Sequence, residues 1–143
     1  MSMNTNTPFA ILSAEHGHFT KEVNAGRTEA LRSQLESRGA AFAPVAGYYK
    51  GVHEQSFIVL LPGGEGSYTF DLVRQLAYRY SQESVLYVDA NRIASLHNPS
   101  ERSTEPATII GRWTTAGDPD AARRLDAWTY YPRTQQYYVV VPL

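Results

Sequence analysis

The sequence predicts an α+β fold in one domain, from its length, its composition and the order of its expected elements. The chain has 143 residues, which is close to the size of a single domain. Hydrophobic residues make up 43% of it and charged residues 19%, so apolar burial can offset the entropy of ordering and disorder is disfavoured. Strand-like apolar runs alternate with two segments of helical spacing in the order β-α-β-β-α-β. We therefore expect residues 1–143 to form one domain.

The first strand and the first helix follow closely on a polar lead-in. Residues Pro8–Ala14 are an apolar run bounded by the lead-in and a loop, which is typical of a short buried strand. Thr20 can cap a helix that extends to Arg38, and Gly39 suits the left-handed position after it. The apolar side chains expected on the buried side of this helix are Val23, Ala30, Leu31 and Leu35.

The next four segments complete the pattern. Ala41–Tyr49 and Glu54–Leu61 are strand-like and are joined by a tight connection at Lys50–Gly51, and Pro62–Gly66 is a loop. Ser84–Asp89 is the fourth strand. The second amphipathic helix lies before it and is marked by Phe70, Val73, Ala77 and Tyr80. This order predicts a ferredoxin-like sandwich, in which two helices cover one face of a four-stranded antiparallel sheet.

The last third of the chain predicts a β-rich C-terminal extension. Asn98–Pro106 is polar and is expected to be a mobile loop. The strands expected here are Thr108–Thr115, Trp128–Tyr131 and Gln136–Val141, the last two joined around Pro132–Thr134. The open face of a ferredoxin-like sheet has to be covered, and self-association through these aromatic strands is one solution. The ten tyrosines of the chain can equally line a site or lie on sheet faces.

Composition excludes several classes of function. Thirteen Lys and Arg residues against 14 Asp and Glu give a formal charge of −1, which disfavours a basic face for nucleic acid. The absence of cysteine excludes disulfides, thiolate metal sites and a cysteine nucleophile. No apolar run approaches the roughly 20 residues of a membrane helix, and residues 1–7 are polar, unlike a secretion signal, and are expected to be flexible. We expect a cytoplasmic protein without nucleic-acid or membrane partners.

Three motifs suggest other chemistry but are better explained as structure. His16-Gly17-His18 invites a metal interpretation, yet the only other histidines, His53 and His97, occur in unrelated contexts, and we expect no metal site. Gly63–Gly66 precedes a helix, where phosphates often bind, but lacks the Gly-Lys-Ser/Thr ending of a P-loop. An RNA-binding sheet would show paired aromatic residues on its central strands, and each of these strands has a single phenylalanine.

Glu54 and Tyr49 form the most informative pair. Glu54 opens an otherwise apolar strand and Tyr49 ends the strand before it, so the phenol and the carboxylate can face each other across the connection. A charge at the mouth of a buried strand costs desolvation free energy unless it is partnered. Glu54 is therefore a candidate functional residue, although a glutamate hydrogen-bonded at a sheet edge would give the same pattern.

An ordered set of motifs carries a family resemblance. In chain order the set is Ser13-Ala14, Glu22-Val23-Asn24, Arg27, Leu31, Leu35, Gly47-x-Tyr49, Glu54, Gln82 and Val85-Leu86-Tyr87. In this set the sequence resembles the phage S-adenosylmethionine lyases, formerly called S-adenosylmethionine hydrolases, over about Phe9–Asp89. The connection between Tyr49 and Glu54 is shorter here than in the best-known member of that family.

The resemblance implies an enzyme and a set of site residues. By position, Tyr49 and Glu54 match the catalytic residues of the family, and Ser13, Ala14 and Gln82 match positions at the substrate. The implied reaction cleaves S-adenosylmethionine to 5′-methylthioadenosine and L-homoserine lactone, with no cofactor, because S-adenosylmethionine is the substrate.

The resemblance also implies an assembly and a biological role. The expected assembly is a homotrimer of ferredoxin-like subunits, similar in shape to the PII signalling proteins, with active sites between neighbours. The expected role is phage anti-restriction in the host cytoplasm, by depletion of the methyl donor. The alternative is a non-catalytic PII-like trimer that binds or senses adenosyl metabolites.

Overall fold

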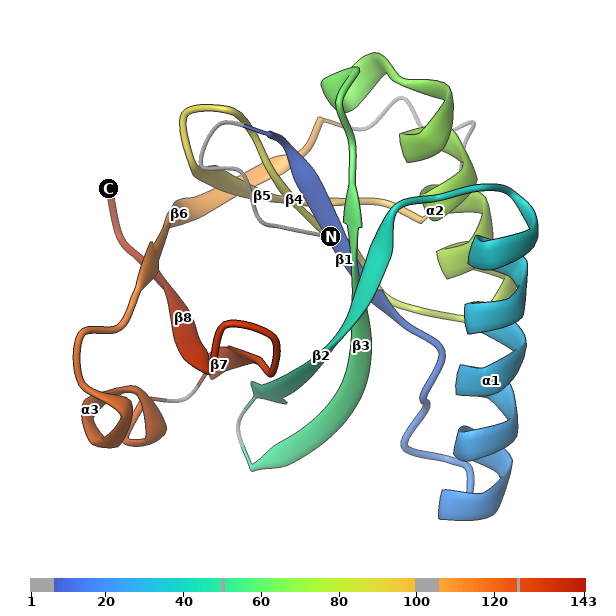
Figure 1. The fold of residues 1–143 in the computed structure, drawn as a ribbon, viewed down its shortest axis with the longest axis horizontal. Helices are drawn as coiled ribbons and strands as arrows, with labels where there is room; N and C mark the ends of the chain where they lie inside the picture. Colours follow the sequence, from blue (N-terminus) through green and yellow to red (C-terminus); the bar gives the residue numbers. More distant parts are fainter. Residues whose placement is uncertain (1–6, 50, 100–105, 126) are drawn as a thin grey trace.

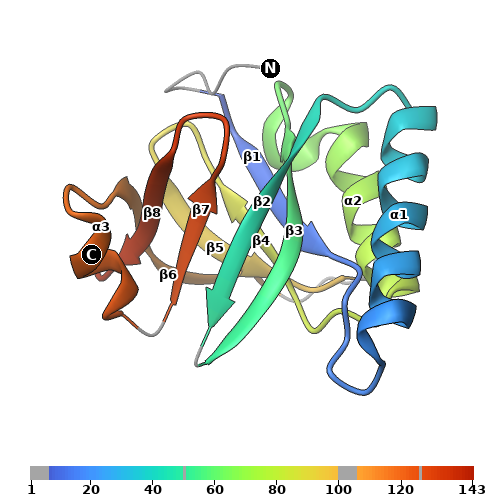
Figure 2. The same ribbon diagram turned by 60° about the horizontal axis from the view of Figure 1, so that its bottom comes forward.

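The computed structural model describes residues 7–49, 51–99, 106–125 and 127–143, and its strands form a closed antiparallel β-barrel with two long helices packed on one side (Figures 1 and 2). The barrel order is β1-β3-β2-β7-β8-β6-β5-β4. The elements are β1 (Phe9–Ser13), α1 (Lys21–Ser37), β2 (Phe42–Tyr49), β3 (Val52–Leu60), the 3-10 turn η1 (Gly64–Gly66), α2 (Tyr68–Arg79), β4 (Val85–Val88), β5 (Ile93–His97), β6 (Thr108–Thr115), α3 (Pro119–Arg123), β7 (Ala127–Tyr131) and β8 (Gln136–Val141).

The predicted ferredoxin-like sandwich is wrong, because the sheet does not stay open. The elements from β1 to β4 form, and β4, β1, β3 and β2 lie side by side in that order. The C-terminal strands then pair with both edges of this group: β7 with β2, from Ala46↔Tyr130 to Tyr49↔Ala127, and β5 with β4. Strands β6 and β8 join β5 to β7 and close the barrel. The predicted C-terminal extension is thus half of the barrel wall, and it pairs with the sheet edges for which self-association was one predicted solution.

Strand β5 was not predicted from the sequence, and the tight turn before it and its own residue pattern explain why. Asp89 directly follows β4, and its carboxylate accepts hydrogen bonds from the backbone N–H groups of Asn91 and Ile93, both at 2.9 Å. This turn reverses the chain at once and sends β5 back along β4. The five residues of the strand, Ile-Ala-Ser-Leu-His, do not alternate between apolar and polar side chains.

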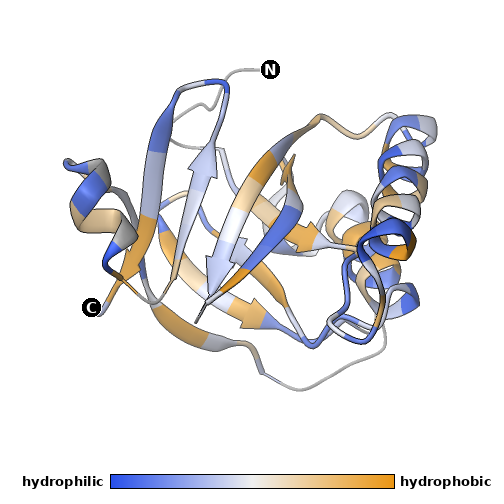
Figure 3. Cartoon of the chain, turned by 90° about the horizontal axis from the view of Figure 1, so that it is seen from below, coloured by the Kyte–Doolittle hydropathy of each residue, from blue (hydrophilic) through white to orange (hydrophobic). Residues whose placement is uncertain are grey.

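The ends of α1 are as predicted, whereas its buried face is shorter. The Thr20 hydroxyl accepts the Val23 N–H at 3.2 Å, and Gly39 has a φ of 71°, so both predicted caps are confirmed. Leu31 and Leu35 are fully buried, but Val23 and Ala30 are exposed. Figure 3 shows α1 as mostly hydrophilic, while hydrophobic residues recur along the strands.

Alternation along the strands builds two cores, one on each side of the barrel wall. In β1, Ala10 and Leu12 face the helices, whereas Phe9 and Ile11 face the barrel interior. The interior core also contains three aromatic residues of the C-terminal strands, Trp113, Tyr131 and Tyr138. These side chains therefore fill the barrel rather than an interface between subunits.

Gly111 permits a close approach of two strands. Its φ is 150°, and a Cβ atom there would lie 2.2 Å from the Val141 carbonyl oxygen of β8. The pairing of β5 with β6 shifts register at Ala94/Ser95, opposite this position. A side chain at position 111 would therefore disturb the closure of the barrel.

Some predictions fall on residues that the structure does not describe. Residues 1–6 of the predicted flexible N-terminus, residue 50 of the tight connection and residues 100–105 of the predicted mobile loop lie outside the described parts. Within the described ranges, no helix is both long enough and apolar enough to span a membrane.

Candidate functional site

The interior of the barrel changes from apolar to polar along its length, and a cavity of about 700 Å³ lies at the polar end. Because alternate residues of a strand face the interior, each strand contributes a short series to it. The inward-facing series run from the packed end to the cavity as Phe9, Ile11 and Ser13 in β1, Val45, Gly47 and Tyr49 in β2, and Ile58, Ser56 and Glu54 in β3. Trp113 and Tyr138, which belong to the interior core, also line the cavity. A barrel mouth of this size can hold one small ligand.

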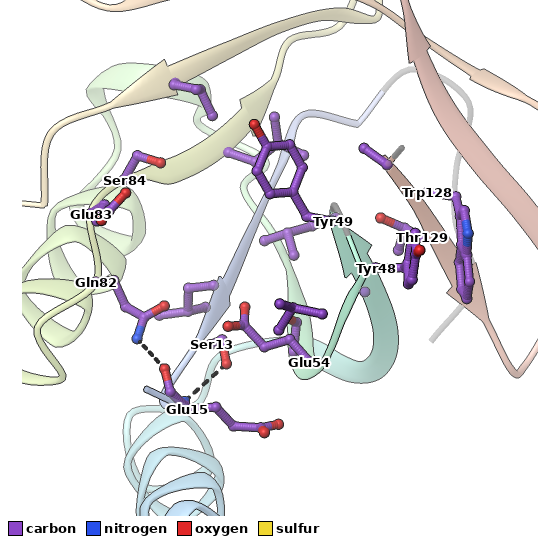
Figure 4. A pocket seen from close by; sticks show the side chains of 18 of the residues that line it. Ser13, Glu15, Tyr48, Tyr49, Glu54, Gln82, Glu83, Ser84, Trp128 and Thr129 are labelled. Atoms are coloured by element: carbon purple, nitrogen blue, oxygen red, sulfur yellow. Dashed lines mark hydrogen bonds between the residues drawn. The ribbon is translucent and has the colours of Figure 1, made fainter. Parts of the chain in front are cut away.

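Glu54 lies in the wall of this pocket and is half-buried. Its partner across the sheet is Gly47, which has no side chain and leaves the space in front of Glu54 open. Burial raises the pKa of the Glu54 carboxyl, the negative charge of Glu15 raises it further, and the nearby Ser13 hydroxyl lowers it. Figure 4 shows Glu54 beside Ser13. Glu54 is thus a carboxylate whose charge a cationic ligand would stabilise.

Tyr49 is at the rim of the same pocket. It pairs with Val52 rather than with Glu54, so the register places it diagonally from Glu54 on the same face of the sheet. Its side chain is 60% exposed, and Figure 4 shows its hydroxyl directed away from Glu54. The two predicted catalytic residues therefore share the pocket, but their side chains do not face each other directly.

Ser13 and Ala14 have different surroundings at the end of β1. Ser13 is buried, lines the pocket, donates to the Gln55 carbonyl at 2.8 Å and accepts the Glu15 N–H at 3.0 Å. Ala14 is also buried but belongs to the core under the helices and is not part of the pocket lining. Its carbonyl accepts a hydrogen bond from Arg27 Nε at 2.7 Å.

Gln82 closes one side of the pocket from the connection between α2 and β4. Its Nε2 donates to the Glu15 carbonyl at 2.9 Å and to the Tyr80 carbonyl at 3.3 Å. Arg27 of α1 also donates to the Tyr80 carbonyl, at 2.6 Å. The end of β1 and the end of α2 are therefore fixed to each other through Gln82 and Arg27.

Asn24 holds the loop between β1 and α1. Its Oδ1 accepts the His16 N–H at 2.9 Å, and its Nδ2 donates to the His16 carbonyl at 3.1 Å. Asn24 and Arg27 lie on one helix three residues apart, which places them on the same face. Asn24 and Arg27 of α1 therefore hold the segments next to the pocket in place, but they do not line it.

The charge of the pocket is one-sided. Its lining includes the carboxylates of Glu15, Glu54 and Glu83 and, among the described residues, neither lysine nor arginine. The rest of the lining includes aromatic and aliphatic side chains of the barrel interior, Trp113, Tyr138, Leu86 and Val140. An acidic pocket that also presents aromatic rings attracts a cation with an apolar body.

The histidine and glycine motifs lie at different distances from the pocket, whose lining includes His16 and Gly17. The His16 and His18 rings stack on each other with centroids 4.7 Å apart. Within the described ranges, no group of three or more His, Cys, Asp or Glu side chains is arranged to hold a metal ion. Residues 63–66 are not part of the pocket lining.

Sequence patterns missed several residues of the pocket. Glu15 directly follows the predicted first strand, so an acid at a strand end was a signal for it. Trp128 and Thr129 reach the pocket through the pairing of β7 with β2, Tyr48↔Trp128 and Gly47↔Thr129. That pairing joins segments about 80 residues apart, and no local pattern indicates it.

Comparison with known proteins gives the family. A search of curated protein sequences found no match. The model of the S-adenosylmethionine lyase family matches residues 10–141, which is nearly the whole chain and includes the C-terminal strands. The chain therefore belongs to the S-adenosylmethionine lyase family, and it is an enzyme of that activity.

Proposed function

We propose that this lyase cleaves S-adenosylmethionine to 5′-methylthioadenosine and L-homoserine lactone by attack of the substrate's own carboxylate. The observation that supports the substrate is the acidic pocket without lysine or arginine among its described lining residues. S-adenosylmethionine carries a sulfonium and an ammonium against one carboxylate, so it is a net cation. An aromatic wall also favours a sulfonium, because the faces of the rings are negative.

The chemistry places few demands on the protein. One carboxylate oxygen of the methionyl group forms a bond to its γ-carbon, the γ-carbon–sulfur bond breaks, and the electron pair goes to sulfur. The sulfonium leaves as a neutral thioether, and no proton has to move. The enzyme's contribution is then to hold the carboxylate in a near-attack geometry, which is worth several kcal/mol in favourable intramolecular reactions (~7–11 kcal/mol at most). Exclusion of water assists, because opposite charges disappear in the transition state.

Each candidate residue has a role in this scheme. Glu54 binds the substrate ammonium rather than acting as an attacking base. Tyr49, at the rim, hydrogen-bonds the reacting end of the substrate once it is bound. Gln82 and Ser13 fix polar groups of the substrate, whereas the Ala14 backbone is held by Arg27 and shapes the wall from behind.

We propose a homotrimer with the sites between neighbouring subunits. The rim of the pocket carries exposed apolar side chains that a second copy would cover: Tyr49, Val52 and Ile110, 60%, 62% and 39% exposed, with Ile109 beside them at 63%. Light scattering is expected to give three times the chain mass of 16.0 kDa. A monomer with full activity would contradict a shared site.

The biological role that we propose is anti-restriction. Consumption of S-adenosylmethionine removes the methyl donor of restriction–modification systems, which suits an enzyme encoded by a phage. Expression in a restricting host is expected to raise the plating efficiency of an unmodified test phage, and an inactive Glu54→Gln variant serves as the control.

The decisive experiment follows the products over time. The purified protein is incubated with S-adenosylmethionine in H₂¹⁸O, quenched rapidly and analysed by liquid chromatography and mass spectrometry. Early homoserine lactone, and later homoserine whose hydroxyl oxygen is unlabelled, are the expected results, because that oxygen comes from the substrate carboxylate. A labelled hydroxyl from the first time point would show attack by water instead. Bound but unchanged substrate would contradict the reaction altogether.

A further inference from the structure

Glu15 follows the end of β1, and its side chain accepts a backbone hydrogen bond from β3 that a further residue of β1 would otherwise accept. The pairing of β1 with β3 ends at Ser13↔Ser56, so Gln55, the next residue of β3, has no backbone partner in β1. Two side chains replace that partner: Ser13 Oγ donates to the Gln55 carbonyl at 2.8 Å, and Glu15 Oε2 accepts the Gln55 N–H at 2.5 Å. Gln55 directly follows Glu54, so these bonds hold the backbone beside it.

The backbone of Glu15 is fixed to two more residues of the site. Its N–H donates to Ser13 Oγ at 3.0 Å, and its carbonyl accepts Gln82 Nε2 at 2.9 Å (Figure 4). Glu15 therefore connects the end of β1, the start of β3 and the connection between α2 and β4. A hydrogen bond to a charged group is stronger than a neutral one, so the bond from its carboxylate to Gln55 is a firm constraint.

Glu15 also acts on Glu54 through its charge. Its carboxylate raises the pKa of the Glu54 carboxyl, second only to burial. The other titratable side chains of the pocket lining, from the elements around Glu54, are His16 beside Glu15, Tyr48 and Tyr49 of β2, Glu83 before β4 and Tyr138 of β8. Among the residues that the structure describes, Glu15 is the one whose charge shifts the pKa of Glu54.

We propose that Glu15 is a positioning residue for the lyase reaction, which holds the Glu54-bearing segment of β3 in place through the backbone N–H of Gln55. This inference rests on the proposed role of Glu54 as the anchor of the substrate. It gives Glu15 two separable contributions, a hydrogen bond to the backbone and a negative charge beside Glu54. Glutamine can retain the first and loses the second, whereas alanine loses both.

The test compares Glu15→Ala, Glu15→Gln and the control Glu36→Gln in kcat/KM for S-adenosylmethionine across pH. Glu36 is an exposed residue of α1, outside the pocket, and its substitution removes the same charge. We expect kcat/KM to fall about tenfold to a hundredfold in Glu15→Ala, because small displacements of a binding group have effects of this size. Glu15→Gln should retain most activity near neutral pH, and Glu36→Gln should match the wild type.

The pH profile separates this role from a merely structural one. Activity should fall in acid as Glu54 becomes protonated and no longer binds the substrate ammonium. Removal of the negative charge of Glu15 lowers the pKa of Glu54, so the acid limb should move to lower pH in Glu15→Gln. The limb should persist in His16→Gln, and its loss there would assign it to His16 and overturn the inference.

The remaining outcomes are equally decisive. Equal losses in Glu15→Ala and Glu15→Gln, wild-type activity in both, or an unmoved acid limb in Glu15→Gln would each overturn the inference. Thermal melting shows whether the variants fold, and if Glu15→Ala does not, the pH profile of Glu15→Gln decides alone. A wild-type protein that leaves S-adenosylmethionine unchanged would refute the proposed function, whereas active wild type with unaffected Glu15 variants would refute only the role of Glu15.

Discussion

The two ends of the barrel interior are built from the same strands but have opposite properties. At the packed end Phe9, Ile58 and Tyr131 are fully or almost fully buried, and at its border with the cavity the Trp113 ring stacks on Tyr138 with centroids 5.1 Å apart and an interplanar angle of 14°. At the open end the same strands present polar side chains to a cavity.

This difference shows how a small barrel separates stability from function. Packing of apolar side chains at one end fixes the strands in register, so that the inward positions at the other end can carry polar groups that packing does not need. A half-buried carboxyl such as that of Glu54 lowers the free energy of unfolding when it is ionised, and the packed end supplies the stability that offsets this cost. Substitutions at the packed end should therefore change mainly the free energy of unfolding, and substitutions at the open end mainly the turnover.

The largest expected effect is on stability at the packed end. Phe9 is completely buried and contacts the Trp113 ring edge-on, with centroids 5.1 Å apart. Phe9→Ala is expected to lower the free energy of unfolding by about 3–5 kcal/mol, because the cavity cannot collapse in a closed barrel. Urea unfolding measures the loss. A loss below about 1 kcal/mol would show that the packed end does not carry the stability of the fold.

The next effect is on turnover at the open end. Glu54→Gln is expected to lower turnover at least about a hundredfold, since a hydrogen bond to a charged group is lost. Its thermal midpoint near neutral pH should not fall and is expected to rise. The pKa of Glu54 is higher in the folded protein than its ordinary value of 4.5, so the folded state holds the proton more tightly and stability decreases as pH rises through this window.

The pH dependence of this stability difference provides its control. Below pH 4.5, the ordinary value, the carboxyl is mostly protonated in both the folded and the unfolded state, so the thermal midpoints of wild type and Glu54→Gln should converge there. A variant that loses stability at neutral pH, or one that keeps near-normal turnover, would show that Glu54 serves the fold rather than the reaction.

A smaller effect is expected at the rim. Tyr49 is 60% exposed, so removal of its hydroxyl in Tyr49→Phe should leave the thermal midpoint unchanged. Turnover should fall about tenfold if the hydroxyl bonds the reacting end of the substrate, which corresponds to one ordinary hydrogen bond of about 1.4 kcal/mol. Steady-state kinetics measure this, and an unchanged kcat would remove Tyr49 from the set of catalytic residues.

The smallest effect concerns a buried hydroxyl at the packed end. Tyr131 is 1% exposed, and its hydroxyl has no hydrogen-bond partner among the described residues. Tyr131→Phe is expected to raise the free energy of unfolding by up to about 1 kcal/mol, because it removes an unsatisfied polar group, and to leave kcat unchanged. Chemical unfolding measures the stability of this variant, and steady-state kinetics measure its kcat. A destabilised variant would show that the Tyr131 hydroxyl makes a hydrogen bond in the folded protein.

Local patterns in the sequence were sufficient for both long helices, for the strands other than β5, and for Glu54 and Tyr49 as candidate residues, whereas Ser13, Ala14 and Gln82 were predicted from the family resemblance. Thr20 and Gly39 marked the ends of α1, and the polar residue at the head of an apolar strand marked Glu54. Four of the five predicted site residues line one pocket, and the fifth, Ala14, is adjacent to it in the chain. Their roles in binding and catalysis stay predictions.

Only the tertiary structure decided that the sheet closes and where the pocket forms. The closure depends on the pairing of β7 with β2 and of β5 with β4. The strands β2 and β7 are far apart in the chain, and their local sequence does not distinguish a strand of an open sheet from a strand of a closed barrel. The same pairing brings Trp128 to the pocket, and the end of the β1 ladder gives Glu15 its place beside Gln55. The sequence by itself determined which residues are apolar, capped or charged, because these properties are local. Which strands become neighbours depends on the packing of the whole chain. This pairing placed the inward-facing side chains of different strands around one pocket.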